Sequence, residues 1–194
     1  MARSGRYKVK FRRRREGKTD YMKRLALLKS RKPRIVVRRT NRYIIVQFVK
    51  FKEEGDEVIA YAFSKELEKY GWPYGGKNLP AAYLTGYLAA MRAKKAGVME
   101  AILDMGRFPS TRGSRLYAAL KGALDAGIDV PHSPEILPDE DRIRGEHIVS
   151  FAEKLDEESL KRQFSDYLRR GADPKMISET FEGILERIST LSND

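Results

Sequence analysis

Cysteine is absent from this sequence of 194 residues. The chain therefore has no disulfide scaffold, no thiolate nucleophile, no cysteine-ligated zinc and no iron–sulfur cluster. Histidine is scarce as well: His132 and His147 stand alone, without the spacing of a metal site and without a nucleophile motif near them. We expect each histidine to make one structural hydrogen bond, and we expect no metal, no cofactor and no catalysis.

Long hydrophobic runs are also missing. No apolar stretch approaches the roughly 18 residues that a membrane-spanning helix needs. The basic N-terminus is not followed by the apolar segment of a secretory signal peptide. It also lacks a lipidation site and a large amphipathic moment, which weakens the alternative of a peripheral membrane protein. We expect a soluble protein of the cytoplasm.

Acidic residues are rare in the first quarter of the chain. Residues 1–50 contain 19 Lys and Arg but only 2 Asp and Glu, whereas residues 51–194 contain 20 and 25. The net charge of +12 is therefore the average of a strongly basic start and a mildly acidic remainder. Phosphate contacts confined to one end orient a protein on nucleic acid and leave its body free to meet other proteins. This distribution predicts a protein that docks onto RNA.

The basic start is predicted to be an arm over residues 1–18, not a folded element. Arg12 to Arg15 form an unbroken block, and such adjacent charges repel one another unless a polyanion lies between them. Tyr7, Phe11 and Tyr21 are interleaved with the cations. Cations neutralise phosphates while aromatic rings stack on unpaired bases, so the pattern favours structured RNA as the ligand. The alternatives are a solubilising tail and a targeting peptide.

Three strands follow a short helix that Thr19 or Asp20 is expected to cap. The strands are predicted at 35–37, 43–49 and 58–63, because these segments are rich in β-branched and aromatic residues and are separated by turn residues. Together they predict an antiparallel meander.

After the meander the hydrophobic period changes to that of a helix. Asn78 is expected to cap a helix that ends at Gly97. Residues 98–103 are then predicted to form a buried strand. A second helix is expected to run through Leu116 and to end at Gly127. Helix–strand–helix units after a meander predict a mixed sheet between helices.

Prolines at 131–138 predict a loop, beyond which helices are expected at 143–155, at 160–168 and along the stripe that begins at Ile177 and ends at Leu191. We therefore divide the chain into three parts. They are a basic arm with a short helix (1–32), an α/β core (33–130), and a loop with a helical C-terminal extension (131–194).

Two motifs point weakly to enzymes. GWPYGGKN at 71–78 resembles a phosphate-binding loop, but it has Asn78 in place of Ser or Thr, and the segment before it looks helical instead of extended. We expect a tight surface loop there. Asp104, Asp125 and Asp129 are candidates for the carboxylates of a metal-dependent nuclease. Because they do not fall on adjacent predicted strands, a basic-armed RNA-processing enzyme is kept only as the alternative.

Several long blocks of sequence occur in the order typical of one family. They are GKTDYMKRL at 17–25, PRIVVRRTNRYIIVQ at 33–47, NLPAAYLTGYLAA at 78–90, AILDMG at 101–106, GSRLYAALKGALDAGIDVPHS at 113–133 and RIRGEHI at 142–148. On these blocks the sequence resembles the archaeal large-subunit ribosomal protein eighteen family, the counterpart of eukaryotic large-subunit protein five.

The resemblance implies a three-layer α/β/α fold with a mixed sheet and ribonuclease-H-like topology, but without catalytic carboxylates. It implies a structural constituent of the large ribosomal subunit that binds 5S rRNA and anchors it in the central protuberance. The implied partners are 5S rRNA, large-subunit rRNA and neighbouring ribosomal proteins, including universal large-subunit protein five.

The expected RNA contacts come from the arm and from two blocks of the resemblance. Those of the arm are Arg3, Arg6, Tyr7, Lys8, Lys10, Arg12, Arg13, Arg14 and Arg15. Those that the resemblance implies are Lys18, Tyr21 and Arg24, and then Arg38, Thr40, Asn41 and Arg42. Gly113, Ser114 and Arg115 also match the family, and they are weaker candidates for RNA contact.

Overall fold

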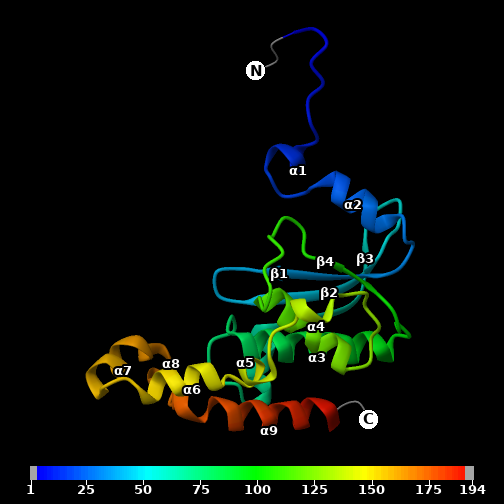
Figure 1. The fold of residues 1–194 in the computed structure, drawn as a ribbon. Helices are drawn as coiled ribbons and strands as arrows, with labels where there is room; N and C mark the ends of the chain where they lie inside the picture. The colour runs from blue at the N-terminus through cyan, green and yellow to red at the C-terminus, as the bar shows by residue number, and fades with distance from the viewer. Residues whose placement is uncertain (1–3, 191–194) are drawn as a thin grey trace.

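A four-stranded mixed sheet lies at the centre of the computed structural model, which describes residues 4–190 (Figure 1). Its strands are β1 (Arg34–Arg39), β2 (Ile44–Lys50), β3 (Glu57–Phe63) and β4 (Ile102–Asp104), in the order β3-β2-β1-β4. The first three strands pair antiparallel, and β4 runs parallel to β1. The predicted meander and the mixed sheet are confirmed.

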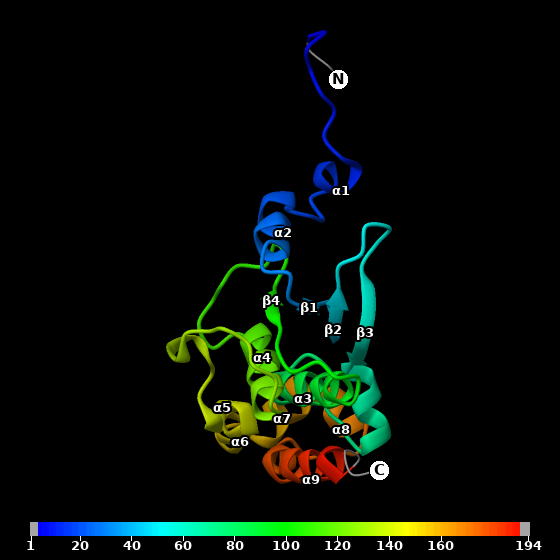
Figure 2. The same ribbon diagram turned by 90° about the vertical axis from the view of Figure 1, so that its right-hand side faces the viewer.

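One face of the sheet forms the core. Side chains alternate between the faces of a strand, so Ile35, Val37, Val46 and Phe48 share a face, and none of them is exposed to solvent. Helices α3 (Leu79–Lys95) and α4 (Arg115–Asp125) cover this face (Figure 2).

Helices α3 and α4 pack against each other at glycines. A Cβ on Gly86 would lie 2.0 Å from the carbonyl oxygen of Ala119, and one on Gly122 would lie 2.2 Å from that of Tyr83. Only residues without a side chain allow the two backbones to approach so closely.

The start of α3 follows the prediction. The Asn78 side chain accepts a hydrogen bond of 2.8 Å from the backbone N–H of Ala81, and Gly97 leaves the helix with a φ of +83°. Asn at the N-cap and Gly beyond the C-terminus are the residues that these positions favour.

The strand predicted at 98–103 is wrong in its bounds. The strand β4 contains only Ile102–Asp104, and Glu100 makes an isolated bridge with Asp129. Val98 and Ala101 are buried all the same. An apolar run indicates burial but does not distinguish a strand from a buried connection.

The N-terminal helices lie on the other side of the sheet from α3 and α4 (Figures 1 and 2). Helix α2 (Tyr21–Leu28) is capped, as predicted, by Asp20, whose carboxylate accepts from the N–H groups of Met22 and Lys23. The predicted three-layer α/β/α arrangement is thus confirmed. One correction concerns the arm: Arg12–Arg15 form a helical turn, α1, although every residue from 4 to 18 is exposed.

The C-terminal region adds helices beneath α3 (Figure 1). They are α5 (Glu140–Arg144), α6 (Glu146–Glu153), α7 (Glu157–Gln163), α8 (Ser165–Arg169) and α9 (Ile177–Thr190). The stripe of α9 is buried, as predicted, at Ile177, Phe181, Ile184 and Ile188, whereas Leu191 lies outside the described residues. No helix within residues 4–190 is long and apolar enough to cross a membrane.

Two of the predicted C-terminal helices are broken. Gly145, with a φ of +94°, separates α5 from α6, and Phe164 leaves the helical conformation between α7 and α8. The short 3₁₀ helices η2 (Pro134–Ile136) and η3 (Pro174–Met176) lie in the connections. A glycine inside a helical pattern ends the helix here because its left-handed conformation turns the chain.

The loop at 71–78 is not the tight surface loop that we predict from the sequence. Trp72 and Tyr74 are 1% and 2% exposed. The Tyr74 hydroxyl donates to the carbonyl oxygen of Asp173 at 2.8 Å, and a Cβ on Gly76 would collide with Tyr43. The 3₁₀ helix η1 (Ser64–Tyr70) precedes the loop in place of a strand. The glycines therefore serve packing, not a phosphate nest.

Candidate nucleic-acid interface

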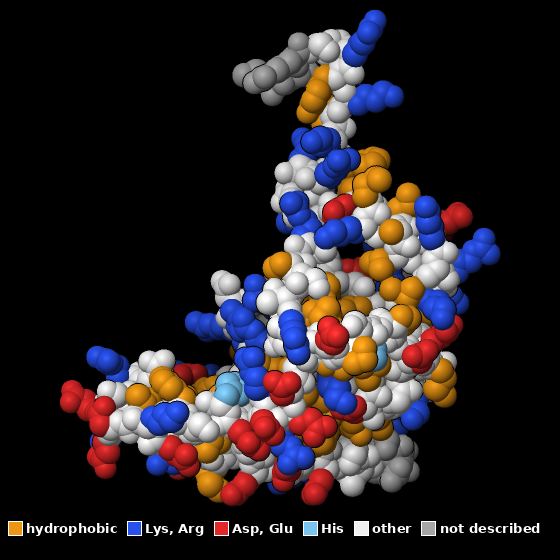
Figure 3. Space-filling model, viewed as in Figure 1, with side chains coloured by type: hydrophobic (Ala, Val, Ile, Leu, Met, Phe, Trp, Pro, Cys, Tyr) orange, Lys and Arg blue, Asp and Glu red, His pale blue; other side chains and the backbone are white. Residues whose placement is uncertain are grey.

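The arm presents its cations to solvent. The expected contacts from Arg6 to Lys18 are all exposed, whereas Arg3 lies outside the described residues. Figure 3 shows Lys and Arg side chains along the arm and few acidic ones. The root of the arm contacts α2, since the ring centroids of Phe11 and Tyr21 lie 5.3 Å apart. The Arg13 Nε also donates to the Thr19 hydroxyl at 2.9 Å, just before that helix.

A groove of about 1100 Å³ runs between α2, the open face of the sheet and the segment 103–110. Several of the expected RNA contacts, which come from separate parts of the chain, line it together. They are Arg13, Lys18, Tyr21, Arg24 and Arg38.

The floor of the groove is a network of arginines and aspartates. Arg34, which is 1% exposed, donates to Asp104 at 2.7 Å and to Asp56 at 2.5 Å. Arg38 donates to the second carboxylate oxygen of Asp104 at 2.8 Å. Arg24 donates one hydrogen bond of 2.9 Å to each carboxylate oxygen of Asp56. A charge as deeply buried as that of Arg34 is tolerated because it is paired and hydrogen-bonded.

The network keeps both aspartates ionised. Burial alone raises the pKa of Asp104, but the Arg38 hydrogen bond and charge, the Gly106 N–H and Arg34 outweigh it and hold the pKa below its ordinary value. Burial also opposes ionisation of Asp56, and the hydrogen bonds and charges of Arg24 and Arg34 lower its pKa in the same way. Two expected RNA contacts, Arg24 and Arg38, are therefore also parts of the scaffold.

The expected contacts Thr40, Asn41 and Arg42 do not lie in the groove. They form the turn between β1 and β2, at the end of β1 that is far from α2 (Figure 1). The Thr40 hydroxyl accepts from the N–H of Tyr43, and the Lys77 Nζ donates to the carbonyl oxygen of Asn41 at 3.1 Å. The structure thus divides the expected contacts between two places.

Sequence reasoning missed cations that line the groove. Lys23 on α2 and Arg107 in the loop after β4 both line it, and neither forms an ion pair within the described part of the chain. The signal for Arg107 was its place directly after the AILDMG block, at the end of a strand, where loop side chains gather.

The nuclease alternative finds no support in the carboxylates. Asp104 is neutralised by arginines, and Asp125 accepts from the Tyr83 hydroxyl at 2.9 Å and from Lys121 at 2.7 Å. Asp129 lies in the chain segment that bridges to Glu100. Within residues 4–190, no three or more His, Asp or Glu side chains form a group that could hold a metal ion.

The two histidines differ from each other. The ring of His132 makes the expected structural hydrogen bond, with its Nδ1 2.7 Å from the carbonyl oxygen of Val130. The expectation is wrong for His147, whose ring has no hydrogen-bond partner among residues 4–190 and lines a second cavity.

Comparison with known proteins identifies the family. Residues 5–99 and 91–133 match the family described as "Ribosomal large subunit proteins 60S L5, and 50S L18". The chain is 91% identical to the "Large ribosomal subunit protein uL18" of Korarchaeum cryptofilum (strain OPF8) over 194 residues, which is 100% of both chains.

Two further relatives carry the same name. The protein of Methanothermobacter thermautotrophicus is 53% identical over 188 residues, covering 97% of this chain and 98% of the relative. That of Aeropyrum pernix is 53% identical over 192 residues, covering 97% and 90%. The chain therefore belongs to the family of the ribosomal large subunit proteins 60S L5 and 50S L18, whose members are structural constituents of the large ribosomal subunit and not enzymes.

Proposed function

We propose that this chain binds 5S rRNA and anchors it in the central protuberance of the large ribosomal subunit, in the cytoplasm. The observation that carries the proposal is the groove, where cations of the arm, of α2 and of β1 converge on one surface. The family membership supports rRNA and ribosomal proteins as partners.

The arm supplies affinity. Its cations neutralise phosphates and release counterions, and its exposed aromatic side chains, Tyr7 and Phe11, stack on unpaired bases. The arm orders along the RNA when it binds. Because its root contacts α2 through the Phe11 and Tyr21 rings, RNA held by the arm is guided into the groove.

The groove supplies a rigid surface. An arginine has five N–H donors. Arg24 uses two of them on Asp56, and Arg38 uses three on Asp104 and Val37, so three and two donors remain for phosphate oxygens. Their side chains are still 30% and 36% exposed. The aspartates fix the orientation of each guanidinium before RNA arrives, which reduces the entropy lost on binding.

The rest of the molecule faces other partners. The acidic C-terminal helices are separated from the arm by the sheet and by α3 (Figure 1). This arrangement favours contact of the C-terminal side with neighbouring ribosomal proteins, including universal large-subunit protein five, while the basic side meets 5S rRNA and large-subunit rRNA.

A filter-binding assay with 5S rRNA tests the proposal. We expect the affinity of the unaltered chain to fall about 10³–10⁵-fold between 50 and 200 mM salt, the range for six to ten phosphate contacts. Replacing all four residues Arg12–Arg15 by Gln should weaken binding and reduce the slope of log K against log salt by about 3 to 4. None of these four side chains is buried, so the fold should survive.

The matched control removes four exposed cations from the C-terminal region. These are Lys154, Lys161, Arg162 and Lys175, each replaced by Gln. Their loss should leave the salt slope unchanged. Equal slopes for the arm variant and the unaltered chain, or no preference of the chain for 5S rRNA over unrelated RNA of the same length, would contradict the proposal.

A further inference from the structure

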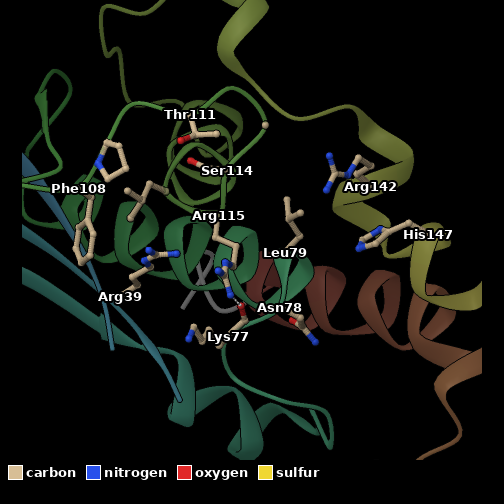
Figure 4. A pocket seen from close by; sticks show the side chains of 13 residues that line it. Arg39, Lys77, Asn78, Leu79, Phe108, Thr111, Ser114, Arg115, Arg142 and His147 are labelled. Atoms are coloured by element: carbon tan, nitrogen blue, oxygen red, sulfur yellow. Dashed lines mark hydrogen bonds between the residues drawn. The ribbon is translucent and has the colours of Figure 1, made fainter. Parts of the chain in front are cut away.

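A second cavity, of about 470 Å³, lies on the other side of Phe108 and Pro109, which line both it and the groove. Five side chains that carry or can carry positive charge line this cavity, which we call the basic pocket, and no Asp or Glu does. They are Arg39, Lys77, Arg115, Arg142 and His147. Figure 4 shows Arg39, Lys77 and Arg115 gathered on one side and Arg142 and His147 directed inward from the other.

The cations of the basic pocket lack counter-charges. Within the described residues none of them forms an ion pair: Lys77 donates to a carbonyl oxygen, Arg115 donates to the carbonyl oxygen of Lys77 at 3.2 Å, and Arg39 lies over the Phe108 ring at 5.1 Å. Arg144, two positions from Arg142, instead donates to Glu182.

The surroundings in the pocket therefore disfavour the protonated forms of Arg115 and His147. Burial, and then the neighbouring Arg39, lower the pKa of Arg115. Burial and Arg142 likewise lower the pKa of His147. Like charges that face one another without a carboxylate are stabilised by an anion that enters between them.

The N-terminus of α4, which opens onto the pocket, also favours an anion as the ligand. Ser114 is the N-cap of α4, but its hydroxyl caps nothing, and its Oγ is buried without a hydrogen-bond partner. Ser114 and Arg115 both line the pocket. The N-terminus of a helix attracts anions through its free N–H groups and its dipole.

We propose that the basic pocket binds a phosphate group in the backbone of the same RNA that the groove holds, so that the RNA passes over Phe108 from one to the other. This inference rests on the proposed function. A cavity lined by cationic donors positions a phosphate but reads no sequence. The loop at 71–78, which supplies Lys77, has its glycines packed against side chains and offers no nest for a free nucleotide.

Two substitutions on one helix separate the pocket from general charge. Arg142→Gln and Arg144→Gln remove the same charge from exposed positions of α5, but only Arg142 lines the pocket. In filter binding to 5S rRNA from 50 to 200 mM salt, Arg142→Gln should reduce the salt slope by about 1, and Arg144→Gln should not change it. Equal salt slopes for the two variants would overturn the inference that the pocket binds a phosphate group. Failure of the unaltered chain to bind 5S rRNA would instead contradict the proposed function.

A second measurement needs neither RNA nor a variant. The chain has two histidines, of which only His147 lines the pocket. In an NMR titration of the full chain, sulfate in place of chloride at equal ionic strength should raise the pKa of His147, since a nearby anion favours imidazolium. The ring signals of His132, which lies outside the pocket, should not respond to the exchange of anion. Equal effects on the two histidines would overturn the inference.

Discussion

Arg34 is the residue on which the open face of the sheet depends. Its guanidinium is buried on β1 and bridges Asp104, 70 positions away, and Asp56, 22 positions away. Because burying an unpaired charge costs several kcal/mol, the two carboxylates are needed to keep this arginine in the sheet. Asp104 is thereby a structural residue, not a metal ligand.

Asp104→Asn tests this role. The change keeps the shape of the side chain but leaves Arg34 and Arg38 with one carboxylate fewer. Since breaking a buried ion pair costs about 3–5 kcal/mol, we expect the free energy of unfolding in urea at pH 7 to fall by about that amount. Asp56→Asn is the control, with a smaller loss, because its side chain is 25% exposed. A loss for Asp104→Asn no larger than for Asp56→Asn would contradict the assignment.

The same variant should change the pH dependence of stability. Both aspartates have a folded pKa below the unfolded one, so their stabilisation is complete above the unfolded pKa, about 3.9, and is lost as the pH falls through the folded pKa. The unaltered chain should therefore lose stability below about pH 4. Asp104→Asn should show a shallower loss in unfolding experiments over that range.

Individual RNA contacts were predictable only as residue types. The predictions of Arg24 and Arg38 rest on their charge and on the resemblance. Their partners lie 32 and 66 positions away, so no local pattern indicates that they also hold the scaffold together. Whether these and the other expected residues touch RNA stays a prediction.

Helices α3 and α4 are the elements that hold the sheet, and their glycines set the distance between them. Local propensity favours alanine over glycine in a helix by about 0.5–1 kcal/mol. At Gly86 the contact with Ala119 outweighs that preference, because the added Cβ would lie 2.0 Å from a backbone oxygen.

Gly86→Ala should therefore destabilise the protein by about 1–3 kcal/mol, the usual cost of overpacking. Gly183→Ala on α9 is the matched control: nothing lies within 4 Å of its added Cβ, so propensity alone should stabilise by about 0.5–1 kcal/mol. Thermal unfolding of both variants measures the difference. The same sign for both changes would refute the packing argument.

Elements whose signal is local were predicted well. The three meander strands, α3, α4 and the stripe of α9 have clear periods and end at capping or turn residues. The predictions were wrong in part for residues 98–103, 143–155 and 160–168. Burial and hydrophobic spacing do not show where a helix is interrupted or how many residues of a strand are paired. The division of the chain after residues 32 and 130 stays a prediction.

On the scale of the molecule, positive and negative charge are concentrated at opposite ends. The arm and the groove lie on one side of the sheet, and the acidic helices lie beyond α3 (Figures 1 and 3). This separation orients the protein on a polyanion before any specific contact forms.

RNA should protect the arm as a whole. Residues 4–18 are exposed and rich in Lys and Arg, so trypsin should cleave the free chain there first. Saturating 5S rRNA should slow this cleavage by an order of magnitude or more, while cleavage in α7, at the exposed Lys161 and Arg162, should keep its rate. Mass spectrometry of the fragments distinguishes the sites. Unchanged cleavage of the arm in the presence of RNA would argue against its role.

The sequence by itself determined the charge distribution, the class of fold, most of the regular elements and the family, because composition, period and long matching blocks are properties of neighbouring residues. The tertiary structure decided where the cations gather and what they meet. It buried Trp72, paired Arg34 with two distant aspartates, and left Arg39, Arg115 and Arg142 together without a carboxylate. These features join residues from separate elements, and only the packing of the sheet and helices brings such residues within reach of one another.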